Sequence, residues 1–320
     1  MAELAAPCIG GHGMDAADNT ASSRSANIHA VVVAYRRYDR LATAFRSLER
    51  QQPPVARVIL VDNTPPAERR RVETTLPVHR LPNERNLNGA GGYAMGILAA
   101  LGAGADHILL LDDDGQLVGA DYIRDALAEL SATGADLVAP LPVDEEDSDQ
   151  LCFPYPVAGG RTYDVAEMER VGRVEGFGHL FNGCVVPAAT FLRFGLPDIR
   201  LCLRGDEVDF LHRMLRNGGR VVTSACIKVA HPSGKPETHS VLWDSLMAID
   251  PGTEAKRYLT FRNRGYIFWH HRRYVTLAAD IVRYFLYFVV LKRDWKAYRN
   301  WVRLTIEGAR SRLGPPETAV

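Results

Sequence analysis

ILLLDDDGQL, residues 108–117, places three consecutive aspartates directly after four apolar residues. The apolar run predicts a buried strand that ends at Asp112, Asp113 and Asp114. Adjacent carboxylates repel one another and raise each other's pKa unless a positive charge lies among them. The rest of the sequence has to explain which positive charge that is.

A divalent metal is one source of that charge. Alternate side chains of an extended segment point to the same side, so Asp112 and Asp114 can converge on one ion while Asp113 points away. Oxygen ligands of this kind suit Mg²⁺ or Mn²⁺, and an ion held by two carboxylates is well placed to bind a diphosphate. Taken alone, the motif leaves an acidic, solvent-exposed turn as the alternative.

Strand and helix patterns alternate around this motif. Strands are predicted at 28–37, 56–64, 78–83, 105–114 and 220–232, and a strand followed by a helix at 181–195. Helices are predicted at 39–51 with Asp39 as N-cap, at 88–104 after a glycine-rich turn, and at 205–219. This alternation indicates an α/β domain with a mostly parallel sheet, which binds ligands at the carboxyl ends of its strands. We expect residues 144–175 to be irregular.

The composition excludes several classes of protein. Lys and Arg number 38, as do Asp and Glu, so net charge gives no reason to expect a nucleic-acid partner. The five cysteines form no CxxC pair, which predicts reduced thiols in a cytoplasmic protein. Residues 1–27 lack the pattern of a signal peptide and read as a disordered tail.

Positive charge gathers in the last part of the chain. The segment Lys256–Arg303 carries twelve Lys or Arg against Asp280 and Asp294, with aromatic residues interleaved. Its longest uncharged run, Tyr284–Leu291, is eight residues long, whereas a spanning helix needs about 20, so we expect no bilayer crossing. Such a pattern suits an anionic membrane surface. The alternative is a helical subdomain whose aromatics pack inward or onto another subunit.

Further polar groups follow other predicted elements. Asp62 in VDN (61–63) ends a strand, where we expect it to be exposed and able to accept a hydrogen bond from a base or ribose. NERNLNGAGGYAMG (83–96) offers amides and small residues to a ligand, although no GxGxxG fingerprint or P-loop is present. RGDEVDF (204–210) places Asp206 and Glu207 at a helix start, either as simple capping acids or as a general base.

His231 follows the last predicted strand. A lone histidine is more often structural or solvated, but beside two aspartates a neutral imidazole can serve as a third metal ligand.

In this order, the segments resemble family 2 glycosyltransferases with the GT-A fold. The matching pieces are VVVAYRR, VILVDN, NLNGAGG, LLLDDD, FNGCVVP and GDEVDF followed by AHP, within about residues 28–235. Within the family the chain looks most like the galactofuranosyl- and rhamnosyltransferases of bacterial cell walls, and among these the actinobacterial enzymes that start galactan.

The resemblance implies roles for individual residues. Asp112, Asp114 and His231 match the ligands of Mn²⁺ or Mg²⁺, and Glu207 matches the catalytic base, which is Asp in many relatives; Asp206 is then a contact to a sugar hydroxyl. The implied contacts to the UDP-sugar are Tyr35, Arg36, Asp62, Asn88, Gly91, Asp112 and Asp113. Candidates for acceptor contacts are His179, Phe181 and Trp243.

The expected architecture has three parts: the tail at 1–27, a GT-A catalytic domain at 28–240 with a Rossmann-like mixed sheet flanked by helices, and a helical C-terminal region at 241–320. The expected activity is inverting transfer of galactofuranose from UDP-galactofuranose to a polyprenyl-diphosphate-linked rhamnosyl-GlcNAc acceptor. We expect the protein to be peripheral to the inner face of the membrane and a possible homo-oligomer. A dTDP-rhamnose-dependent enzyme and a non-catalytic sugar-nucleotide-binding protein are the alternatives. A nucleotidyltransferase fits less well, since AYRRYDR (34–40) lacks the glycines of its early loop.

Overall fold

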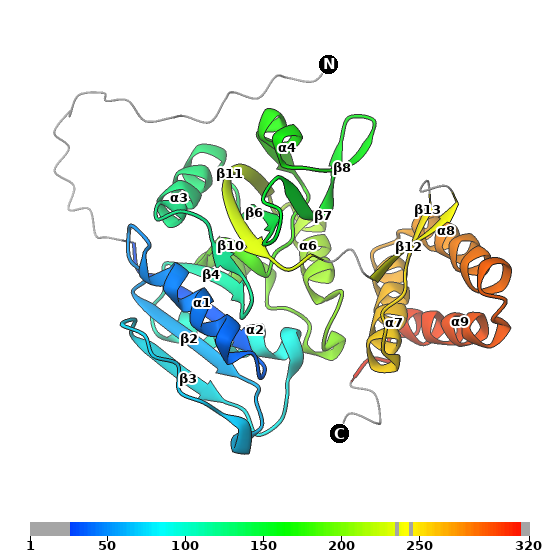
Figure 1. The fold of residues 1–320 in the computed structure, drawn as a ribbon, viewed down its shortest axis with the longest axis horizontal. Coiled ribbons are helices and arrows are strands. Elements are labelled where there is room, and N and C mark those ends of the chain that lie inside the picture. Colours follow the sequence, from blue (N-terminus) through cyan, green and yellow to red (C-terminus); the bar gives the residue numbers. More distant parts are fainter. Residues whose placement is uncertain (1–25, 234–236, 243–245, 315–320) are drawn as a thin grey trace.

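The computed structural model describes residues 26–233, 237–242 and 246–314. They form an α/β domain with a helical C-terminal part beside it (Figure 1). Trp243 and residues 1–25 of the expected tail lie outside the described residues.

The main sheet has the strand order β3-β2-β1-β4-β10-β6-β11-β5. The strands in this order are β3 (Val78–Pro82), β2 (Arg57–Asp62), β1 (Ile28–Ala34), β4 (His107–Asp112), β10 (Asn182–Pro187), β6 (Leu137–Asp144), β11 (Val221–His231) and β5 (Gln116–Leu117). β10 runs antiparallel to its neighbours β4 and β6, and β5 runs antiparallel to β11, while the other neighbours are parallel. The expected mixed, mostly parallel sheet is confirmed.

Helices cover both faces of this sheet, which explains the continuous apolar runs of its strands. Ile28, Ala30 and Val32 of β1 pack with α1 and α3 on one face, whereas Val31 and Val33 pack with α2, α5 and α6 on the other. The helices are α1 (Tyr38–Glu49), α2 (Asn88–Gly102), α3 (Tyr122–Thr133), α5 (Ala188–Phe194) and α6 (Asp206–Arg216), with 3₁₀ turns η1 (Pro66–Glu68) and η2 (Ile199–Leu201).

The strand order makes β1 and β4 neighbours in the sheet. The chain adds β2 and β3 on one side of β1 and then places β4 on its other side. The segments that follow β1 and β4 therefore lie side by side at the carboxyl ends of the strands, where Arg37 contacts Asp113 and Asp114, and this edge of the sheet is where such folds bind ligands.

Three local expectations were wrong. Residues 144–175 are not irregular: they form β7 (Gln150–Val157), β8 (Gly160–Asp164), α4 (Val165–Val171) and β9 (Arg173–Glu175). The prolines of this segment are tolerated because β7 and β8 form a hairpin off the main sheet path. α1 begins at Tyr38 with Arg37 as N-cap, so Asp39 lies in its first turn. Cys226 is disulfide-bonded, whereas Cys184 and Cys202 are free thiols.

The C-terminal part has its own apolar cluster. It contains a hairpin of β12 (Thr238–Leu242) and β13 (Leu246–Ile249), then α7 (Glu254–His270), α8 (Tyr274–Phe285), the π-helical segment η4 (Leu286–Leu291) and α9 (Trp295–Ala309). Its cluster includes Phe261, Tyr284, Phe288 and Trp301, so several of the aromatic residues pack inward. Tyr274–Leu291 has the length and composition of a candidate membrane span, with a mean hydropathy of 1.6. The length of the longest run without charged residues did not predict this segment, because Asp280 and Arg283 interrupt its apolar sequence.

Polar contacts fix this part to the catalytic domain. The side-chain amide of Asn263 in α7 donates to the backbone carbonyls of Leu201, Leu203 and Arg204 at 2.7–3.0 Å. Arg262 beside it is fully buried. Figure 1 shows α7 between the main domain and the pair α8 and α9.

The packing of α2 on β1 depends on small residues. A Cβ at Gly92 would lie 2.6 Å from Val33 Cγ1, and one at Gly96 would overlap Val31 Cγ1. We predict that Gly96→Ala lowers the free energy of unfolding by about 1–3 kcal/mol, because overpacking must shift the helix. Urea unfolding measures this change. Gly102→Ala in the same helix is the control, because nothing lies within 4 Å of its added Cβ; equal stability of the two variants would contradict the packing role.

Candidate active site

Asp112, Asp114 and His231 come together at the edge of the sheet. β5 starts two residues after Asp114, and its Gln116 pairs with Ala230, the residue before His231. The pairing of β5 with β11 thus brings the histidine to the aspartates. One ligand atom from each of the three side chains lies within 4.8 Å of the others, and His231 Nε2 is 3.5 Å from Asp114 Oδ1.

The chemistry of this set fits a divalent metal. His231 Nδ1 lies 2.7 Å from the Pro232 carbonyl, which can only accept, so Nδ1 carries the proton and Nε2 offers its lone pair beside the acids. Burial raises the pKa of Asp112 well above its usual range, and the charge of Asp114 raises it further. Tyr93 donates to Asp112 Oδ1 at 2.6 Å and orients it. Two carboxylates and an imidazole suit Mn²⁺ or Mg²⁺.

Asp113 is not part of the group of three that could hold a metal ion. It is 1% exposed, accepts a hydrogen bond from the backbone N–H of Tyr35 at 3.0 Å and forms an ion pair with Arg37. Burial raises its pKa to about 6, against the opposing effect of Arg37. The Arg37 guanidinium also contacts Asp114, so this side chain provides part of the positive charge that the three acids require.

Arg37 was missed, whereas its neighbours Tyr35 and Arg36 were proposed for the nucleotide. Arg36 has a φ of 67° and forms an exposed ion pair with Glu68. The contact of Arg37 with the acids could have been found only from the strand register. Val33 pairs with Asp112, so the residues that follow β1 lie opposite those that follow β4.

The expected exposure of Asp62 was wrong. Its side chain is fully buried, and its oxygens accept hydrogen bonds from Tyr38 at 2.8 Å, from Arg80 Nε at 3.0 Å and from the backbone N–H of Thr64 at 3.0 Å. Arg80 on the neighbouring strand β3 covers it, and these bonds hold its pKa below the usual value despite burial. Its contact to uracil stays a prediction.

The glycine-rich segment starts α2 directly, without the expected preceding turn. Asn88 has a φ of 57° and its carbonyl accepts from the side-chain amide of Asn63 at 3.3 Å. A Cβ at Gly91 would lie 2.7 Å from Leu87 Cβ, so this glycine is needed for packing. Sugar-nucleotide contacts of Asn88 and Gly91 stay predictions.

Asp206 and Glu207 begin α6, after Gly205 with a φ of 101°. Glu207 Oε2 accepts the backbone N–H of Leu180 at 3.1 Å, and burial raises the pKa of this carboxyl. Burial and the charge of Glu207 raise the pKa of Asp206 to about 7. Asp206 Oδ2 has no hydrogen-bond partner among the described residues and would lie 3.4 Å from a Cβ at Gly89. It is therefore available to a hydroxyl bound at the start of α2.

His179 lies in an aromatic cluster beside these acids. Its ring stacks on Phe153 with centroids 4.5 Å apart, and Tyr155 and Phe177 lie 5.5 Å away. Phe153 is also 5.9 Å from His231, which joins the cluster to the metal-ligand set and makes Phe153 a residue missed from sequence. Phe181 is 6% exposed and stacks on Tyr93, so it supports the site from the core and offers little surface to an acceptor.

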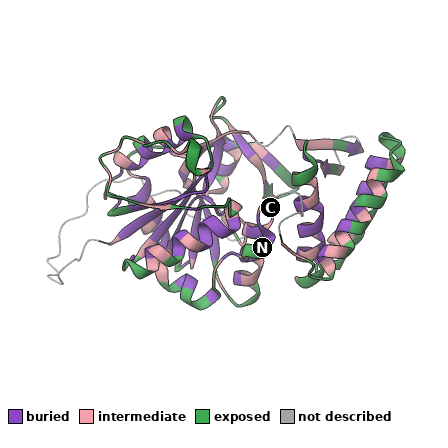
Figure 2. Ribbon diagram, turned by 90° about the horizontal axis from the view of Figure 1, so that it is seen from below, coloured by how far each residue is buried: buried purple, intermediate pink, exposed green. Residues whose placement is uncertain are grey.

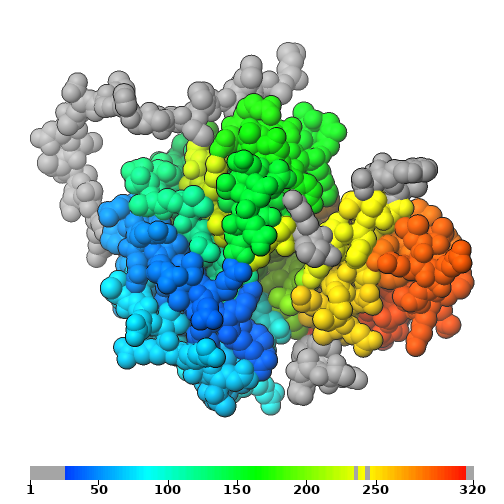
Figure 3. Space-filling view, viewed as in Figure 1, coloured from blue at the N-terminus to red at the C-terminus, as the bar shows by residue number. Residues whose placement is uncertain are grey.

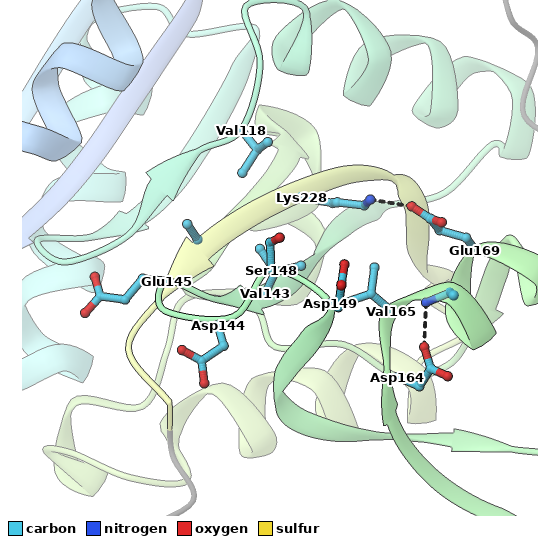
Figure 4. A pocket seen from close by; sticks show the side chains of 12 residues that line it. Val118, Val143, Asp144, Glu145, Ser148, Asp149, Asp164, Val165, Glu169 and Lys228 are labelled. Atoms are coloured by element: carbon cyan, nitrogen blue, oxygen red, sulfur yellow. Dashed lines mark hydrogen bonds and ion pairs between the residues drawn. The ribbon is translucent and has the colours of Figure 1, made fainter.

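A cavity of about 560 Å³ lies elsewhere on the domain (Figure 4). Its walls carry five acids, Asp144, Glu145, Asp149, Asp164 and Glu169, and Lys228, which is paired with Glu169. The described residues that line it include no predicted site residue.

Comparisons with known proteins agree with this geometry. Residues 30–182 match the family described as glycosyl transferase family 2. Galactofuranosyltransferase GlfT1 of Mycobacterium tuberculosis (strain ATCC 25618 / H37Rv) is 33% identical over 297 residues, 91% of this chain and 98% of that protein. GlfT1 of Mycolicibacterium smegmatis (strain ATCC 700084 / mc(2)155) is 34% identical over 292 residues, 89% of this chain and 97% of that protein.

Two solved glycosyltransferase structures share the fold. GalNAc-T7 with UDP, GalNAc and Mn²⁺ matches with a TM-score of 0.52 at 13% identity, over 77% of this chain and 48% of that chain. S. aureus TarS matches with a TM-score of 0.53 at 13% identity, over 92% of this chain and 50% of that chain. This chain spans about half the length of each. The likeness confirms the expected GT-A fold.

We predict that Arg37→Gln binds Mn²⁺ about fivefold more tightly in the absence of nucleotide, because it removes a partly exposed cation that competes for Asp114. Isothermal titration calorimetry measures the affinity. Arg36→Gln is the matched control, since the neighbouring arginine pairs with Glu68 instead. An unchanged affinity in Arg37→Gln would show that the guanidinium and the metal do not compete.

Proposed function

Because the chain belongs to glycosyltransferase family 2, we propose that it is a metal-dependent, inverting galactofuranosyltransferase. Its donor is UDP-galactofuranose, and its acceptor is a polyprenyl-diphosphate-linked rhamnosyl-GlcNAc in galactan synthesis at the cytoplasmic side of the membrane. The observation that carries this proposal is the convergence of Asp112, Asp114 and His231 beside Glu207 in a chain similar to two GlfT1 proteins over about nine tenths of its length.

The mechanism follows from the positions of the acids. Asp112, Asp114 and His231 would hold a divalent ion, which would supply charge neutralisation for the diphosphate of the departing UDP. Glu207 removes the proton from the acceptor hydroxyl. The hydroxyl oxygen forms a bond to the anomeric carbon of the donor sugar, while the bond between that carbon and the diphosphate oxygen breaks on the opposite face. Configuration inverts, and UDP leaves. Asp206 accepts a hydrogen bond from a sugar hydroxyl and holds the reacting atoms in line.

The nearest alternative is transfer of rhamnose from dTDP-rhamnose, which would use the same metal ligands and base. A sugar-nucleotide-binding protein without catalysis is the alternative of another class. It would bind UDP with Mn²⁺ but would have no requirement for Glu207.

We predict that the protein with Mn²⁺ and a synthetic lipid-linked rhamnosyl-GlcNAc turns over UDP-galactofuranose, and that Glu207→Gln lowers kcat by about 10²–10⁴-fold while still binding UDP. Product analysis by mass spectrometry measures the transfer. Glu254→Gln, which changes an exposed glutamate in the first turn of α7, should match the wild type. Activity with dTDP-rhamnose alone would favour the rhamnosyltransferase, and activity that survives Glu207→Gln would remove the assigned base.

The same base predicts a pH dependence. Burial raises the pKa of Glu207, and below that pKa the protonated carboxyl cannot accept the hydroxyl proton. We therefore expect kcat/KM to rise with pH and to level off at a pKa above the ordinary glutamate value of about 4.3. Initial rates across a pH series, at saturating Mn²⁺, measure this limb. A limb at or below the ordinary value would contradict the buried base.

A further inference from the structure

The outward face of α8 is apolar along its whole length. Val275, Ala278, Ala279, Val282 and Phe285 are exposed and recur every three or four residues, so they lie on one side of the helix, here called the α8 face. Val275 is 86% exposed and Val282 is 57% exposed. A helix that faces water normally carries polar residues on this side. In Figure 3 the orange surface of this segment forms the outer flank of the molecule.

The two charged residues within α8 do not reach this face. Asp280 is 1% exposed and pairs with Arg264 of α7 at 2.7 Å and with Arg283. Tyr284 on the same inward side is fully buried against Trp301, with ring centroids 4.9 Å apart. One side of the helix is therefore held by α7 and α9 and the other side is free. Figure 2 shows buried and exposed residues mixed along the helices of this part of the molecule.

Basic and aromatic residues lie at both ends of the α8 face. Arg272 and Arg273 precede α8, and Lys292, Arg293 and Lys296 follow η4; all five are exposed. Exposed Trp269 lies against Tyr274 at the first end, and exposed Trp295 lies against Phe285 at the other. An apolar strip between cations, with indole rings at its ends, matches the region between lipid headgroups and acyl chains.

We propose that the α8 face docks on a bilayer that contains anionic lipid and lies in the plane of its surface. The inward contacts of Tyr284 and Asp280 keep one side of the helix against α7 and α9 and away from lipid, so the proposed segment lies on the membrane and does not span it. A second copy of the chain fits the face less well. Because both ends are basic, two copies related by a two-fold axis would oppose like charges, whereas lipid phosphates complement them.

Vesicle co-sedimentation of the full chain tests this proposal, without donor or acceptor. We expect binding to phosphatidylcholine vesicles that contain phosphatidylglycerol, weaker binding to phosphatidylcholine alone, and loss of binding as salt rises. Val275→Asp should weaken binding about tenfold. Leu192→Asp is the matched control, since Leu192 is 79% exposed on α5 of the catalytic domain, and it should bind as the wild type does. Thermal unfolding checks that both variants are folded.

Three results would overturn the proposal: no sedimentation of the wild type with anionic vesicles, equal binding by the two variants, or a wild-type dimer in light scattering that Val275→Asp converts to a monomer without any vesicle binding. The last result would assign the α8 face to a second copy of the chain. Transfer to a water-soluble acceptor analogue should be unchanged in Val275→Asp, so failure of membrane docking is distinguishable from failure of the proposed transferase activity.

Discussion

Repulsion among three aspartates at the end of one buried strand is the constraint on which the catalytic part depends. The carboxylates are compensated from two sides: Asp112 by the hydroxyl of Tyr93 on α2, and Asp113 and Asp114 by Arg37 in the segment after β1. The acids therefore tie α2, the β1 loop and β4 to a single point. The remaining excess of negative charge favours a cation at this point over a closed ion-pair network.

The sheet places these acids at an edge where a ligand can reach them. β1 and β4 are neighbours, so the acids lie at the carboxyl ends of adjacent parallel strands, the edge at which such sheets bind ligands. The antiparallel strand β10 starts at the same edge, and the backbone just before it, at Leu180, holds Glu207. Strand ends thus position the proposed metal-ligand set, and the backbone before β10 fixes the carboxylate of the proposed base, Glu207.

The parts of this site that were predictable are those that depend on local sequence patterns. The run of three aspartates after a buried strand was enough to predict that Asp112 and Asp114 come together, although β4 ends at Asp112 and a turn, not an extended chain, places Asp114. The role of Arg37 was not predictable in this way, because it depends on the register between β1 and β4, whose residues are 79 positions apart at Val33 and Asp112. The burial of Asp62 has the same origin: Arg80, which covers it, comes from the neighbouring strand. Long-range pairing decided every site feature that local patterns left open.

The C-terminal part connects the α8 face to the segment that carries Glu207. Asn263 is 1% exposed and donates to carbonyls of Leu201, Leu203 and Arg204, and these carbonyls directly precede the start of α6, which carries Glu207. Buried bonds of this kind are costly to break, since each leaves unpaired polar groups in the core. The helix that α8 packs against is therefore joined to the segment that orients the base. A membrane contact at α8 would hold Glu207 at a constant orientation to the bilayer, which is the geometry that a lipid-anchored acceptor requires.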